Sequence, residues 1–161
     1  MLIPDRDIAF EAFAASICVK FSAFERLSPG DTKARCRLLE SISDDIKKCS
    51  NLTRPRISQK ALDKCKALGI ENLQDKDWHD QPKFDPGRKI FRWEHFNPVS
   101  AIREKCHAKS EQEIFEILKK GILVVWILKE EDKELTRQGR RIDRPDPEAA
   151  YRDAKIVIVS I

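Results

Sequence analysis

The stretch Ile122–Leu128, with the sequence ILVVWIL, is an unbroken run of seven apolar residues. A short apolar run that is rich in β-branched residues is typical of a strand. Because the run is hydrophobic on both faces, we expect other parts of the protein to cover it on both sides. It therefore predicts a buried strand in a small sheet with helices around it.

A second strand is expected over residues 89–96, whose sequence is KIFRWEHF. Large apolar and aromatic side chains alternate along this stretch, as they do on a half-buried strand. We expect residues 89–96 and 122–128 to be hairpin-like partners, and residues 155–161 to form a terminal strand. Short helices are expected over residues 130–137 and 147–154.

The N-terminal half of the chain predicts packed helices. Phenylalanine and isoleucine recur at spacings of three and four within residues 5–27, which is the pattern of one helix face. Asp31 is expected to cap a second helix, and Ser58–Leu68 has the composition of a third. Further on, Ser110 and Glu113 have the spacing of a capping box that opens another helix.

These elements predict an α+β fold, with a helical N-terminal half followed by a small sheet that helices flank. We expect a single domain over residues 1–161, in which 1–70 form a helical layer and 71–161 form the α+β part with the candidate site. Residues 71–89 are rich in turn-forming residues, so an ordered loop is expected just before that site.

The composition is that of a globular protein with a highly charged surface, since 36% of the residues are charged and 41% are hydrophobic. The net charge of +4 permits a polyanionic partner without requiring one. Five cysteines form no C-x-x-C pair, which favours free thiols in a reducing cytoplasm. No apolar run is long enough to span a bilayer, so a soluble cytoplasmic protein without a membrane partner is expected.

The stretch WEHFNP, residues Trp93–Pro98, contains the chemistry that is most specific in the sequence. Glu94 and His95 are neighbours on a predicted strand, so their side chains leave on opposite faces if the strand is regular. A bulge or strand end at Phe96–Asn97 would let both reach one site. A carboxylate there binds a hard divalent cation, and a neutral histidine accepts a proton from water.

Glu94-His95-Phe96-Asn97-Pro98 resembles the acid-His-x-x-Pro signature that opens the ββα-metal fold of HNH-type (His-Me finger) nucleases. The resemblance covers residues 89–137 and implies a strand, a second strand and a helix. It implies that His95 is the general base and that Glu94 is a ligand of Mg²⁺ or another divalent cation. Glu131 or Asp132 would supply the helix's ligand, although this chain has Glu-Glu-Asp where the family usually has Asn or His.

An arginine-rich segment follows the expected metal helix. Arg137, Arg140, Arg141 and Arg144 lie within eight positions, and arginine forks suit phosphate oxygens. Together with Arg92 they are the candidate nucleic-acid-binding residues. The alternative is a solvated loop whose arginines pair with nearby aspartates.

Two further residues are candidates for supporting roles at the site. His79 lies in the turn-rich loop before the motif, and Asn97 is the expected cap of the helix that begins at Pro98. His79 is a second ligand or a substrate contact in the functional interpretation, and a surface histidine in the structural one.

The sequence leaves three functions open. The leading hypothesis is a metal-dependent nuclease that hydrolyses phosphodiester bonds in nucleic acid, with DNA favoured. The second is a non-enzymatic interaction protein, such as a phage or defence-related factor that binds a protein or a nucleic-acid complex. The third is a nuclease fold that is now used only for binding. A structural His95 at a strand-to-helix junction would fit the second or the third function.

Overall fold

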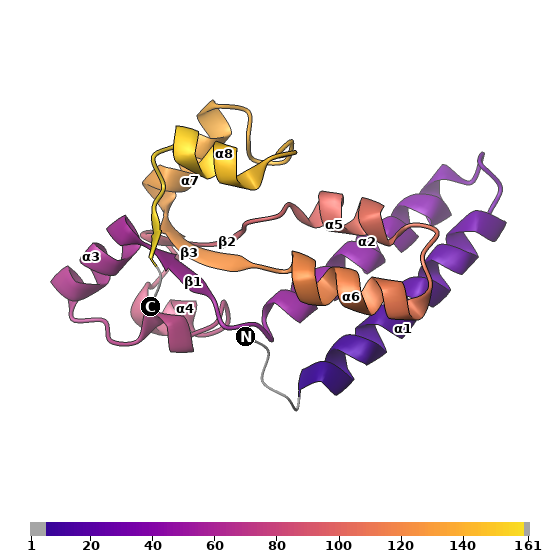
Figure 1. Cartoon of the computed structure of the whole chain (residues 1–161), viewed down its shortest axis with the longest axis horizontal. Helices are drawn as coiled ribbons and strands as arrows, with labels where there is room; N and C mark the ends of the chain where they lie inside the picture. The colour runs from indigo at the N-terminus through magenta and orange to yellow at the C-terminus, as the bar shows by residue number, and fades with distance from the viewer. Residues whose placement is uncertain (1–5, 160–161) are drawn as a thin grey trace. The chain divides into compact units, whose positions relative to one another are not determined.

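The computed structural model describes residues 6–159 and confirms an α+β protein (Figure 1). The chain divides into two compact units. The helical unit contains the described residues up to Thr53 and returns over Val99–Ile122. The sheet unit contains Arg54–Pro98 and the described residues from Leu123 onward. The helices expected between the two main strands therefore belong to the helical unit.

Within its described residues, the helical unit consists of four helices: α1 (Asp7–Arg26), α2 (Thr32–Ser50), α5 (Val99–Cys106) and α6 (Glu111–Gly121). As expected, the side chain of Asp31 caps α2, and Ser110 and Glu113 form a reciprocal capping box at the start of α6. Both caps satisfy backbone N–H groups that a helix start leaves unpaired.

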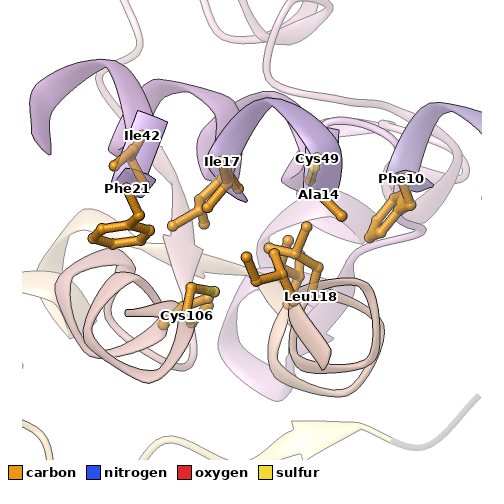
Figure 2. Packing of buried hydrophobic residues seen from close by; sticks show 12 residues of the cluster. Phe10, Ala14, Ile17, Phe21, Ile42, Cys49, Cys106 and Leu118 are labelled. Atoms are coloured by element: carbon orange, nitrogen blue, oxygen red, sulfur yellow. The ribbon is translucent and has the colours of Figure 1, made fainter. Parts of the chain in front are cut away.

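The core of the helical unit is apolar and closely packed. Figure 2 shows Phe10, Ile17 and Phe21 of α1 pointing toward Cys106 and Leu118 of the facing helices, and all five side chains are buried. Burial of this apolar surface is the main driving force for folding of the unit.

In residues 6–159, four strands form one mixed sheet in the order β2-β3-β1-β4: β1 (Arg56–Ser58), β2 (Phe91–His95), β3 (Val124–Leu128) and β4 (Ile158–Val159). Strands β2 and β3 are antiparallel, as expected for the two main strands. The parallel pairing of β1 with β3 was not predicted, because three residues after a proline carry too little periodicity. The predicted terminal strand 155–161 is shorter within the described residues, and positions 160–161 lie outside them.

Helices cover both faces of this sheet, as the apolar run of β3 predicts. Figure 1 shows α3 (Gln59–Leu68) and α4 (Gln81–Phe84) on one side and α7 (Lys129–Arg137) and α8 (Pro147–Asp153) on the other. Trp126 of β3 packs on the first side, whereas Val125 and Ile127 pack on the second. A short 3₁₀ helix, Leu73–Asp75, adds to the first side.

The start of β2 is held by a buried carboxylate. Asp85 accepts hydrogen bonds from the backbone N–H groups of Lys89, Ile90 and Phe91, at 2.9 to 3.2 Å, and from the side-chain amide of Gln81. Burial by itself raises the pKa of Asp85, but these hydrogen bonds outweigh it and hold the pKa below its ordinary value. The loop before the motif is therefore ordered.

Among the described residues, no helix is both long enough and apolar enough to cross a lipid bilayer.

Candidate functional site

Strand β2 sends its side chains alternately to the two faces of the sheet. Its pairing with β3 advances one residue at a time from Phe91 to His95, so no bulge interrupts it. Glu94 therefore leaves on the face that α7 and α8 cover, and His95 leaves on the opposite face together with Trp93. The convergence of Glu94 and His95 on one site, which the nuclease hypothesis requires, is absent from this arrangement.

The carboxylate of Glu94 is paired with a buried arginine. Arg144 donates a hydrogen bond from Nη2 to Glu94 Oε1 at 2.8 Å, and the Arg144 side chain is fully buried. Burial raises the pKa of Glu94 above its ordinary value, and the adjacent guanidinium of Arg144 opposes that rise. One oxygen of this proposed metal ligand is therefore already bound to a cation.

Arg144 also fixes the turn that precedes it. Its Nη1 donates to the carbonyl oxygens of His95 and Phe96, at 2.9 and 3.0 Å, and its Nε donates to the carbonyl of Arg140 at 2.8 Å. These bonds hold the arginine-rich turn against the end of β2. The predicted contact of Arg144 with nucleic acid is not supported by this arrangement, because its guanidinium is buried and occupied.

Glu131 of α7 connects three elements. Its Oε2 accepts hydrogen bonds from the hydroxyl of Ser58 at 2.7 Å and from the backbone N–H of Leu128 at 2.8 Å. Ser58 is itself the cap of α3, because its hydroxyl accepts from the N–H of Ala61. Glu131 is only 3% exposed, so it serves the junction of β1, β3 and α7.

Asp132 lies beside Arg92, with 3.7 Å between Asp132 Oδ2 and Arg92 Nε. On this face of the sheet, three buried oxygens have no hydrogen-bond partner among the described residues: Glu131 Oε1, Asp132 Oδ1 and Tyr151 Oη. Burial raises the pKa of Tyr151, and the charge of Glu94 raises it further. We refer to the set of Arg92, Glu94, Glu131, Asp132, Arg144 and Tyr151 as the acid–arginine cluster.

The acid–arginine cluster does not fit Mg²⁺ as it stands. Magnesium requires near-octahedral oxygen coordination and several ligands from protein or water. Glu94 is bound to Arg144, and Glu131 has one oxygen bound to Ser58 and Leu128. Among residues 6–159, no group of three His, Cys, Asp or Glu side chains is arranged to hold a metal ion.

The remaining predicted residues lie at separate places in the sheet unit. His79 is exposed in the loop before α4, where its ring contacts Trp78 at 5.2 Å between centroids. Asn97 is partly buried just after β2. Arg137 forms a bidentate pair with Glu134, at 2.6 and 2.9 Å, which leaves Glu134 with a pKa of about 2.

The sequence interpretation missed a row of basic side chains on α7. Lys129 and Lys133 precede Arg137 at intervals of four residues, so the three side chains lie along one line of the helix. Glu131 and Leu135 are the buried residues of α7, so this line faces away from the sheet. The spacing of these residues can be read from the sequence, but the sequence does not show which side of the helix faces the solvent.

No protein family, curated protein or solved structure matches this chain in the comparisons that were made.

Proposed function

We propose that the protein binds nucleic acid, with duplex DNA favoured, through the outer side of α7 and the turn that follows it, and that it does so without cutting the strand. The observation that carries this proposal is the line of Lys129, Lys133 and Arg137 on the outside of α7. We call this line, together with Arg140 and Arg141, the basic row.

The cations of the basic row are available to phosphate oxygens. Within residues 6–159, Lys129, Lys133, Arg140 and Arg141 form no ion pair, whereas Arg137 is paired with Glu134. Lys133 and Arg141 are exposed to solvent. Four unpaired cations on a helix and its adjoining turn suit the regularly spaced charges of a phosphate backbone.

The buried arginine supports the same function indirectly. Arg144 holds the carbonyls of Arg140 and Arg141 at 2.8 and 3.3 Å, so the backbone that carries these two side chains is fixed. A fixed backbone reduces the entropy lost when the side chains bind a ligand. Arg144 is thus a positioning residue for the basic row.

Binding without hydrolysis is favoured because the acids of the cluster are occupied. Glu94 neutralises Arg144, and Glu131 accepts hydrogen bonds from two other elements. Glu94 is 8% exposed and Glu131 is 3% exposed, so a phosphodiester has little access to them. These carboxylates stabilise the sheet unit.

The test is fluorescence anisotropy with a labelled DNA duplex at several salt concentrations. The variant Lys129→Gln/Lys133→Gln is expected to bind DNA duplexes of every base sequence more weakly than the wild type does. The slope of log K against log salt should fall by about 0.9 for each phosphate contact removed. An Arg140→Gln/Arg141→Gln variant is expected to behave in the same way.

The matched control is Lys60→Gln/Lys64→Gln. These lysines are exposed on α3 with the same spacing of four, and α3 packs on the opposite face of the sheet. The control should bind like the wild type. If the control weakened binding as much as Lys129→Gln/Lys133→Gln does, or if the wild type showed no saturable binding at low salt, the proposal would be contradicted.

Metal-dependent hydrolysis of DNA is the second candidate. It is favoured by the order β2, β3 and α7, and by the two buried oxygens Glu131 Oε1 and Asp132 Oδ1 that lack a partner among the described residues. A plasmid-nicking assay with Mg²⁺ and with Mn²⁺ separates the two candidates. Nicking that is lost in Asp132→Asn or His95→Ala, at an unchanged melting temperature, would establish hydrolysis instead of binding alone.

A further inference from the structure

The helical unit has a pocket of about 350 Å³ between α1, α2 and α5. This volume lies within the range of about 300 to 1,000 Å³ that is usual for small-molecule sites. The residues that line it are Phe21, Phe24, Leu39, Arg103, Glu104 and His107. Its location in the helical unit makes it separate from the basic row.

The walls of the pocket are aromatic. The rings of Phe21 and Phe24 meet edge to face at 6.5 Å, and the ring of His107 lies 5.1 Å from that of Phe21. Arg35 covers one face of Phe24 at 3.8 Å, which fixes the orientation of that ring. Ring edges and faces arranged in this way accept another aromatic ring.

One cation and one anion line the same pocket. Arg103 uses Nη1 to donate to the hydroxyl of Ser43 at 3.0 Å, and a guanidinium has five N–H donors, so others are left for a carboxylate. Glu104 is exposed and follows Arg103 on α5. Neither residue forms an ion pair within residues 6–159. His107 is bound to Glu25 at 2.6 Å, so its ring is held as part of the wall.

We propose that this pocket binds an aromatic amino acid as its zwitterion. The aromatic side chain would contact Phe21, Phe24 and Leu39, the carboxylate would pair with Arg103, and the ammonium group would pair with Glu104. A site with one free cation, one free anion and an apolar wall is complementary in charge to such a ligand, and it is less suited to a ligand with a single charge.

The test uses three probes that differ in their charged groups: L-phenylalanine, phenylacetate and phenethylamine. Binding to the full chain is measured by ligand-detected NMR and by calorimetry. L-Phenylalanine is expected to bind most tightly, since each of the other two lacks one ion pair. Arg103→Gln should weaken the binding of L-phenylalanine and phenylacetate at least tenfold and leave the binding of phenethylamine unchanged. Glu104→Gln should weaken the binding of L-phenylalanine and phenethylamine and leave the binding of phenylacetate unchanged.

Lys105→Gln is the matched control, because Lys105 is an exposed neighbour on α5 that does not line the pocket. It should bind all three probes like the wild type. Melting curves on each variant separate loss of binding from loss of folding. Binding of the three probes with equal affinity, or the absence of saturable L-phenylalanine binding by the folded wild type, would overturn the proposal.

Discussion

Arg144 shows how one side chain can connect distant parts of a chain. It donates to a carboxylate fifty positions earlier in the sequence and to carbonyls at the end of β2 and in the adjacent turn. A buried ion pair of this kind contributes modestly to the stability of the fold when both partners are present. The loss of one partner is strongly destabilising, because it leaves an uncompensated buried charge.

Arg144→Met is therefore expected to lower the free energy of unfolding by about 3–5 kcal/mol, because Glu94 remains buried without its cation. Urea titration followed by tryptophan fluorescence measures the change. In a Glu94→Gln background, the same substitution should cost less, since no buried negative charge is left behind. An equal cost in both backgrounds would show that Arg144 acts only through its backbone contacts.

Asp85 leads to a prediction about pH. Its pKa is lower in the folded protein than in the unfolded chain, so its ionised form stabilises the fold above the unfolded value of about 3.9. This stabilisation is lost as the pH falls through the folded pKa. Asp85→Asn should lower the free energy of unfolding by about 2–4 kcal/mol at pH 7.

The difference between wild type and Asp85→Asn should shrink as the pH falls below about 4, when the wild-type carboxyl becomes protonated. Chemical denaturation at a series of pH values measures this difference. A difference that stays constant down to pH 2 would show that the charge of Asp85 is not what holds the start of β2.

At the scale of elements, strand and helix boundaries followed local signals where those signals were strong. The apolar run at Ile122–Leu128 correctly predicted β3 with cover on both faces, and Ser110 with Glu113 correctly predicted the start of α6. Strand β1 was not predicted, because its three residues are too few to show a strand pattern and become a strand only by pairing with β3 and β4.

The Ser58 hydroxyl bonds both to the start of α3 and to Glu131 of α7, so it is expected to contribute more to stability than a helix cap alone. Ser58→Ala removes the cap of α3 and one of the two hydrogen bonds to buried Glu131 Oε2, and it should lower the free energy of unfolding by about 1–3 kcal/mol. Urea titration measures this loss. Thr136→Ala, an exposed hydroxyl on α7, is the control and should change stability by less than about 0.5 kcal/mol.

At the scale of the whole molecule, the chain has two compact units, each with its own buried apolar core. All three tryptophans, at positions 78, 93 and 126, belong to the sheet unit. Tryptophan fluorescence therefore reports on that unit, whereas circular dichroism at 222 nm reports mainly on the helices α1, α2, α5 and α6 of the other.

We expect thermal unfolding followed by these two probes to give transitions with different midpoints, because two separate cores need not unfold together. A substitution confined to the helical core, Ile17→Ala, should shift the circular dichroism transition more than the fluorescence transition. Coincident midpoints in the wild type and in Ile17→Ala would show instead that the two units unfold as one.

The candidate site was predictable only in its residue types. The sequence singled out Glu94, Glu131, Asp132 and the arginines as candidate site residues. Of these, Arg92, Glu94, Glu131, Asp132 and Arg144 lie on one face of the sheet. It did not predict that Arg144 would be buried against Glu94, that Tyr151 would belong to the acid–arginine cluster, or that Ser58 would donate a hydrogen bond to Glu131. Pairs separated by fifty or more positions leave no trace in local periodicity.

By itself, the sequence determined the secondary structure of its strongest segments and the α+β class, because apolar spacing and capping residues act over a few positions. Only the tertiary structure decided that residues 99–122 pack with the N-terminal helices, that β1 pairs with β3 in parallel, and that Glu94 and His95 lie on opposite faces of β2. These outcomes depend on contacts between distant segments, whose free energy comes from burying surfaces that meet only in the folded chain.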